Sequence, residues 1–204
     1  MEPRFVHLCI HSEYSLVDGL VRIKPLAAKA AQQGMAAVAI TDRSNLFAMV
    51  KFYRAALAAG VKPIIGVDLL IHNEEDTNHP HRLLLLVRNQ SGYLNLNRLI
   101  SRAYREGQHL GVPMIERNWL DKAADGLIAI LPCFDSDIGQ LLLAGKEHEA
   151  AQGLAWWHSC FPGALYLGVS RTGRPNEEEA VHAMVSLSSS EQIPLVAIND
   201  VRFI

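Results

Sequence analysis

The strongest constraint on the fold is a regular alternation of short apolar segments with helical segments along the whole chain. The predicted strands lie at residues 5–10, 37–41, 62–71, 83–87, 127–131, 165–169 and 195–198. The predicted helices lie between them, at residues 25–33, 46–59, 92–106, 116–123, 136–159 and 177–191. Apolar strands separated by helices are typical of a parallel sheet that is covered by helices.

Seven strand units favour an α/β fold with a closed, distorted, TIM-like (β/α) barrel, and a doubly wound open sheet is the alternative. A chain of 204 residues without an internal linker, repeat or low-complexity segment is expected to form a single domain over residues 1–204. The chain stops at Ile204 without a polar tail. This ending predicts a piece cut from inside a longer protein.

Composition narrows the classes of function. Half of the residues are hydrophobic and 20% are charged, which predicts a packed core. A net charge of −2 argues against a strongly basic nucleic-acid surface, and the sequence has no evident basic stripe interleaved with aromatic residues. Three cysteines far apart predict reduced thiols and a cytoplasmic location, and neither a signal peptide nor a membrane span is evident.

Polar residues follow several of the predicted strands, at the ends where barrel enzymes carry their chemistry. His11 follows the first strand and Cys133 the fifth. Asp42 with Arg43 follows the second strand, and Asp200 with Arg202 follows the seventh. Asp68 lies inside the third strand, where a buried carboxylate requires a partner. We therefore expect one polar site at the mouth of the barrel.

Ordinary structural roles remain open for several of these residues. Cys9 fits a core cysteine, although it shares a strand face with His11. Asp18 fits a turn with Gly19, and Asp42 fits the N-cap region of the second helix. The polar segment 72–82 is interpreted as a loop, with His79-Pro80-His81 solvated. Trp156-Trp157 is interpreted as a pair that packs a helix against the barrel, with a partner surface as the alternative.

Several ordered motifs together resemble one family. They are Phe5-Val6-His7-Leu8, His11-Ser12-Glu13-Tyr14-Ser15 with Asp18-Gly19, Ile40-Thr41-Asp42, Lys62-Pro63-Ile64-Ile65-Gly66, Gly92-Tyr93-Leu94-Asn95-Leu96, Arg171-Thr172-Gly173-Arg174-Pro175 and Asn199-Asp200-Val201. Over essentially the whole chain, the sequence resembles the polymerase-and-histidinol-phosphatase (PHP) domain family. The resemblance is to the branch that forms the N-terminal domain of bacterial DNA polymerase III alpha subunits. It implies a distorted seven-stranded barrel. It also implies that the chain is an N-terminal fragment of a much longer polymerase, and together with the end at Ile204 this predicts a barrel truncated at its C-terminal end.

The resemblance also implies a metal cluster that this chain has partly lost. Metal-bearing relatives use such a cluster for phosphoester hydrolysis. Seven positions keep ligand-type residues, namely Cys9, His11, Asp18, Asp42, Asp68, Cys133 and Asp200. Three arginines stand at or beside positions where the relatives have histidines, namely Arg43, Arg82 and Arg202.

Arginine cannot replace histidine as a ligand, because its guanidinium keeps its proton and has no lone pair to donate. We therefore expect a degenerate site without bound metal and no catalytic residue. In it, Arg43, Arg82 and Arg202 are expected to neutralise Asp42, Asp68 and Asp200. The alternatives are a single residual zinc or manganese ion on the remaining ligands, or phosphate or sulfate at an arginine-lined mouth.

The resemblance implies a function within a larger replicative polymerase, a DNA-directed DNA polymerase and nucleotidyltransferase. The expected role is structural and docking, with the remainder of the alpha subunit and the proofreading exonuclease (epsilon) subunit as partners. DNA is expected to be contacted only through the parent polymerase. The alternative is a working metal-dependent phosphoesterase, either a 3′–5′ exonuclease or a pyrophosphatase. A free-standing histidinol phosphatase of the same fold is the third possibility.

Overall fold

The structure, a computed structural model, describes residues 5–204 and divides into two compact units. The first unit contains the chain up to Asp68 together with Asn199–Ile204, and the second contains Leu69–Ile198. The first unit is therefore built from the two ends of the chain, and the second from one continuous segment. No helix in the described part is both long enough and apolar enough to span a membrane.

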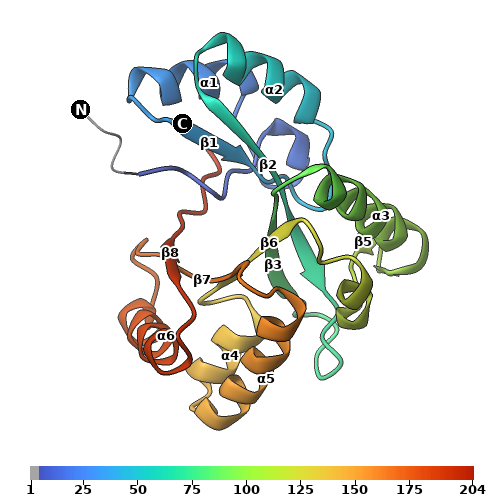
Figure 1. Cartoon of the computed structure of the whole chain (residues 1–204), viewed down its shortest axis with the longest axis vertical. Coiled ribbons are helices and arrows are strands. Elements are labelled where there is room, and N and C mark those ends of the chain that lie inside the picture. The colour runs from blue at the N-terminus through green and yellow to red at the C-terminus, as the bar shows by residue number, and fades with distance from the viewer. Residues whose placement is uncertain (1–4) are drawn as a thin grey trace. The chain divides into compact units, whose positions relative to one another are not determined.

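In the first unit, helices α1 (Ile23–Gln32) and α2 (Met49–Ala58) pack on each other and on strand β1 (Ala37–Ile40). Figure 1 shows the two helices side by side along β1. β1 pairs in parallel with β2 (Lys62–Ile71), from Ala37 opposite Lys62 to Ile40 opposite Ile65. The core between helices and strands is built from buried apolar side chains, including Ile10, Ile23, Leu26, Val38, Ile40 and Phe52.

The expected strand at 5–10 is not formed as a regular strand. Its backbone contacts β1 through Ala39 N–H to the His7 carbonyl (2.9 Å), and Ile10 forms one isolated bridge with Val201. The Ile10 N–H donates to the Thr41 hydroxyl (2.9 Å) instead of to a backbone carbonyl. This side chain takes the place of a ladder partner, so the pairing stays irregular while the segment still runs beside the sheet.

In the second unit, four strands lie in the order β3 (His81–Val87), β6 (Leu127–Pro132), β7 (Leu165–Val169) and β8 (Leu195–Ala197). β6, β7 and β8 are parallel, but β3 is antiparallel to β6. The expectation of an all-parallel sheet was therefore wrong at β3. Segment 72–80, which precedes β3, contains no helix, and a parallel connection needs a crossover of a dozen or more residues.

The helices of the second unit follow the expected ranges with two differences. They are α3 (Gln90–Glu106), α4 (Asp137–Leu143), α5 (Glu147–Cys160) and α6 (Glu177–Glu191). The expected helix at 136–159 is divided into α4 and α5, because Gly145 adopts a positive φ of 71° between them. The expected helix at 116–123 is a 3-10 helix, η2 (Arg117–Lys122), and a further 3-10 turn, η1 (Glu13–Ser15), follows Ser12 in the first unit.

A small antiparallel ribbon of β4 (Gln108–His109) and β5 (Val112–Pro113) follows α3 and was not predicted. The α3 N-terminus is capped by Asn89, whose side chain accepts the Gly92 N–H (3.0 Å). Of the Trp156-Trp157 pair, Trp157 is fully buried and stacks on Phe161, whereas Trp156 is only partly buried.

Candidate functional site: a carboxylate–arginine network

Eight of the ten expected site residues lie in the first unit. The irregular segment before η1 carries Cys9 and His11, and the loop after η1 carries Asp18. Asp42 and Arg43 follow β1 after Thr41, and Asp68 lies in β2. Asp200 and Arg202 come from the C-terminal segment, which is held by the His11 N–H donating to the Val201 carbonyl (2.9 Å).

His11 is fully buried at the centre of these residues. Its Nδ1 lies 2.9 Å from Asp18 Oδ1, and its Nε2 lies 2.9 Å from Asp68 Oδ2. The imidazole is therefore engaged on both sides by acids.

Asp42 is held by hydroxyl and backbone donors instead of by the expected arginine. It accepts the Ser12 N–H (2.6 Å), the Ser12 hydroxyl (2.9 Å) and the Ser15 hydroxyl (3.0 Å). Burial raises the pKa of Asp42, and these donors oppose that shift. Asp42 was expected to be neutralised by one of the three arginines, but these donors hold it instead. The helix-cap interpretation was wrong, because the residue at the N-cap of α2 is Ala48. In the sequence, the two serines of the His11–Ser15 motif were the residues that could have indicated these donors to Asp42.

Arg202 joins two carboxylates. Its Nη2 lies 2.7 Å from Asp200 Oδ2 and its Nε lies 3.2 Å from Asp200 Oδ1, so the pair is bidentate. Its Nη1 donates to Asp18 Oδ2. Burial alone would lower the pKa of Arg202, but the two carboxylates outweigh burial and raise it. Burial alone would raise the pKa of Asp18, but His11 and Arg202 outweigh burial and hold this pKa below its usual value.

Arg43 provides the second cation of the network. Its Nη2 lies 3.4 Å from Asp68 Oδ2 and 3.8 Å from Asp18 Oδ2. The expected neutralisation of Asp200 by Arg202 is present, and Asp68 receives Arg43 together with His11. Asp18, expected only as a residual ligand, is the carboxylate that connects His11, Arg43 and Arg202.

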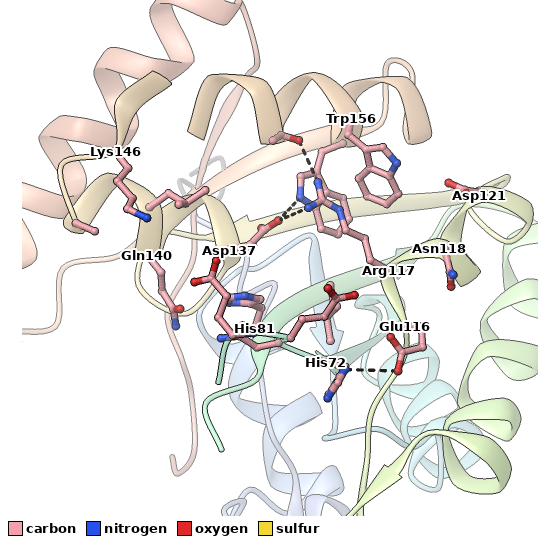
Figure 2. A pocket seen from close by; sticks show the side chains of 18 residues that line it. His72, His81, Glu116, Arg117, Asn118, Asp121, Asp137, Gln140, Lys146 and Trp156 are labelled. Carbon is pink, nitrogen blue, oxygen red and sulfur yellow. Dashed lines mark hydrogen bonds and ion pairs between the residues drawn. The ribbon is translucent and has the colours of Figure 1, made fainter. Parts of the chain in front are cut away.

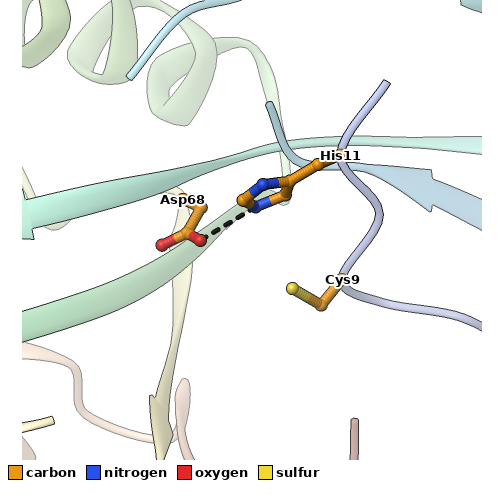
Figure 3. Close-up of side chains that lie close together, drawn as sticks. All are labelled: Cys9, His11 and Asp68. Carbon is orange, nitrogen blue, oxygen red and sulfur yellow. Dashed lines mark hydrogen bonds and ion pairs between the residues drawn. The ribbon is translucent and has the colours of Figure 1, made fainter. Parts of the chain in front are cut away.

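Three of these residues could still hold one ion. Ligand atoms of Cys9, His11 and Asp68 all lie within 4.8 Å of one another, and all three residues are buried (Figure 3). Thiolate, imidazole and carboxylate form a donor set that suits zinc. A multi-ion cluster does not fit, because both nitrogens of His11 already face carboxylates and two guanidinium groups contact those same carboxylates.

The remaining two expected residues, Cys133 and Arg82, lie in the second unit. Cys133 directly follows β6 and is buried, and burial raises the pKa of its thiol despite hydrogen bonds from Ser170. Within this unit, Arg82 Nη1 lies 2.9 Å from Asp135 Oδ2, and the Arg82 N–H donates to the Asp135 carbonyl (2.6 Å). Asp135 was not recognised as a partner from the sequence.

The second unit also contains a cavity of about 660 Å³ that none of the ten expected residues lines. Arg117 lines this cavity, and its guanidinium carbon lies 4.2 Å from the centre of the Trp156 ring (Figure 2). Its Nη1 lies 3.4 Å from Asp137 Oδ2. His81 lines the same cavity, and burial lowers its pKa. The interpretation of His79-Pro80-His81 as a solvated loop was therefore wrong for His81, which opens β3 and is partly buried.

Comparison with known proteins identifies relatives at two levels. The sequence profile of the PHP domain matches residues 7–172. DNA polymerase III subunit alpha of Pseudomonas aeruginosa is 50% identical over 204 residues, which are 100% of this chain and 17% of that protein. The same subunit of Escherichia coli K12 is 44% identical over 203 residues, covering 100% of this chain and 18% of that protein. The chain thus spans less than a fifth of the length of these relatives.

Solved structures support the same fold. A putative metal-dependent phosphoesterase from Bifidobacterium adolescentis superposes with a TM-score of 0.69 at 11% identity, covering 99% of this chain and 89% of that one. An amidohydrolase from Chromobacterium violaceum, with bound sulfate and no metal, gives a TM-score of 0.64 at 13% identity, covering 97% and 87%. The similarity confirms the expected α/β architecture.

Proposed function

Because this chain belongs to the PHP domain family, we propose that it is the PHP domain of a cytoplasmic DNA polymerase III alpha subunit and acts there as a structural and docking module. Identities of 44–50% over the full chain to two such subunits support this assignment. In this proposal the ancestral metal site is replaced by a network of carboxylates and arginines, and the proofreading exonuclease subunit is a docking partner.

The observation that carries the metal-free part of the proposal is the position of Arg202. Its guanidinium forms a bidentate pair with Asp200 and also donates to Asp18, two positions at which the family pattern has metal ligands. A dication and a guanidinium ~4 Å apart repel by several kcal/mol even at an effective dielectric of about 20. The carboxylates that would attract the metal are thus already neutralised by a group that repels it.

Elemental analysis tests this part. The chain is purified without chelator, and zinc and manganese are measured per mole of protein. We expect clearly substoichiometric metal and no hydrolysis of a chromogenic phosphoester in added manganese or zinc. Arg43→His/Arg202→His is the matched positive control, because it restores two imidazoles and removes two cations. Stoichiometric metal with turnover in the unmodified chain would refute the metal-free site.

A binding measurement tests the docking part. Immobilised proofreading exonuclease subunit is titrated with the alpha chain, first at full length and then as residues 1–204 after circular dichroism has established that this piece is folded. We expect both to bind. A folded piece that does not bind, beside a full-length chain that does, would place docking outside this domain.

A metal-dependent phosphoesterase is the second candidate, and the cluster of Cys9, His11 and Asp68 favours it. One ion on these three residues could polarise a phosphate and lower the pKa of a bound water. If this candidate is correct, Cys9→Ala abolishes both metal uptake and activity. The structurally similar protein from Bifidobacterium adolescentis is described as metal-dependent, but at 11% identity it supports the fold alone.

A further inference from the structure

Helix α2 has apolar residues on its outward face as well as on its inward face. Phe52 and Ala56 are fully buried and anchor the helix. On the other side, Val50, Tyr53 and Leu57 are 55%, 49% and 54% exposed. Their spacing of three and four residues places them in one stripe along the helix. Phe47, which is 63% exposed, precedes the stripe at the N-terminal end.

The neighbouring helix α1 shows that such exposure is not general in this layer. α1 buries Ile23 and Leu26, and its exposed positions are Lys24, Pro25, Ala28, Lys29 and Gln32. A surface helix normally has polar residues opposite its buried stripe, as α1 does. A second apolar stripe on α2 therefore indicates a surface that another molecule covers.

The charge around the stripe is of one sign. Between Asp18 and Asp68 the only acidic residue is Asp42, which is buried. The same segment carries six exposed cations, namely Arg22, Lys24, Lys29, Lys51, Arg54 and Lys62. Lys51 and Arg54 stand on α2 itself, within one turn of Val50, Tyr53 and Leu57. Among residues 5–204, the acidic partner of this group is Glu13, which lies 3.6 Å from Lys51. A local excess of cations occurs in a chain whose net charge is −2.

We propose that the α2 surface, comprising Phe47, Val50, Lys51, Tyr53, Arg54 and Leu57, is a docking site for an acidic amphipathic helix of a partner protein. The apolar stripe can pack against the apolar face of a partner helix, and the flanking cations select acidic flanks on the partner. Nucleic acid fits less well, because the centre of the surface consists of large apolar side chains and not of hydrogen-bond donors for phosphate. The inference rests on the docking role proposed above and specifies where on the domain it occurs.

The test uses the purified full-length alpha chain and two synthetic fluorescent peptides of equal length. Both peptides carry leucines at helical spacing. One carries glutamates on its flanks and the other carries lysines. Fluorescence anisotropy measures the affinity of each peptide. We expect the acidic peptide to bind and the basic peptide to bind at least about tenfold more weakly, as electrostatic complementarity requires.

Three paired variants locate the site. Val50→Ser/Leu57→Ser removes part of the stripe, and Lys51→Gln/Arg54→Gln removes its cations. Each is expected to weaken the acidic peptide about tenfold, which is typical of central contact residues. Lys24→Gln/Lys29→Gln is the matched control on α1. This variant removes the same two positive charges from a helix that has no exposed apolar stripe. We therefore expect the affinity for the acidic peptide to fall by less than about threefold.

Several results would overturn the proposal. If the α1 control weakens peptide binding equally, the peptide is attracted by the general positive charge of the domain and not by the α2 surface. Tighter binding of a single-stranded oligonucleotide through the same residues would assign the surface to nucleic acid. Failure of the acidic peptide to bind would also overturn it, and maleimide labelling of Val50→Cys would then show whether the polymerase's own chain covers α2. If the α2 variants still bind the proofreading subunit, the face is wrong while the docking role stands.

Discussion

Individual side chains decide the chemistry of the network in the first unit. His11 and Arg202 both contact Asp18, and Asp18 links the loop after η1 to the C-terminal segment. Replacing an imidazole by a guanidinium does more than delete a ligand. A guanidinium offers no lone pair to a metal and instead binds neighbouring carboxylates directly, as Arg202 binds Asp18 and Asp200.

Removing Arg202 should leave two acids without their main cation. We expect Arg202→Ala to lower the free energy of unfolding by about 2–3 kcal/mol, since the guanidinium is only partly exposed. Arg202→Lys should lower the free energy of unfolding by about 1 kcal/mol, because an ammonium keeps the positive charge but cannot form the bidentate pair of hydrogen bonds. Urea unfolding measures both. If Arg202→Ala is as stable as the unmodified chain, the pairs of Arg202 with Asp18 and Asp200 contribute nothing to stability.

The Asp18 carboxyl should make stability depend on pH in one direction. Its pKa in the folded chain lies below the ordinary value, so its contribution is present above the unfolded pKa and is lost as the pH falls through the folded one. We expect Asp18→Asn to be less stable than the unmodified chain from pH 7 to about pH 5, and the difference to shrink below about pH 4. Urea unfolding at several pH values checks this. A difference that grows toward low pH would contradict it.

The sequence predicts the elements better than the pairings between them. The α6 range was predicted as observed, because polar termini and an apolar face mark it locally. The reversal of β3 could not be predicted from its own apolar residues, since direction depends on the connection that precedes it. The family pattern placed Asp68 and Arg202 at the site, but the donors to Asp42 come from Ser12 and Ser15, about 30 residues away in sequence. Such partners are fixed only by the fold.

The start of α3 depends on close backbone contact. A Cβ on Gly92 would lie 1.8 Å from the Gly126 carbonyl oxygen. We expect Gly92→Ala to cost about 3 kcal/mol or more, because backbone cannot yield as a side chain can. Ser91→Ala, on the preceding residue, removes one exposed hydrogen bond to Asp125 and should cost less than about 1 kcal/mol. Thermal unfolding compares the two variants, and similar losses would contradict the close-contact explanation.

The whole molecule joins a discontinuous unit to a continuous one. Residues 199–204 complete the first unit through the His11 N–H to Val201 carbonyl bond (2.9 Å) and the Leu20 N–H to Arg202 carbonyl bond (2.8 Å). The second unit, by contrast, contains all of its own strands and helices from Leu69 to Ile198. The two units should therefore respond differently to loss of the last six residues.

We expect a chain ending at Ile198 to exchange its backbone amides at least about tenfold faster around His11 and Leu20, because the opening free energy there falls by more than about 1.4 kcal/mol. Exchange in α4 and α5 should change little. Hydrogen exchange followed by mass spectrometry resolves the two regions. Uniform acceleration across both units would show that they unfold as one.

The C-terminal position of Arg202 also orders events during synthesis. The ribosome releases the chain from its N-terminus, so His11, Asp18 and Asp68 emerge before Arg202 has been translated. At bacterial elongation rates this interval is on the order of ten seconds. During that time Asp18 lacks the Arg202 guanidinium that later contacts it, while Arg43 has already been translated. The nascent chain is thus exposed to cellular metal ions before Arg202 completes the network.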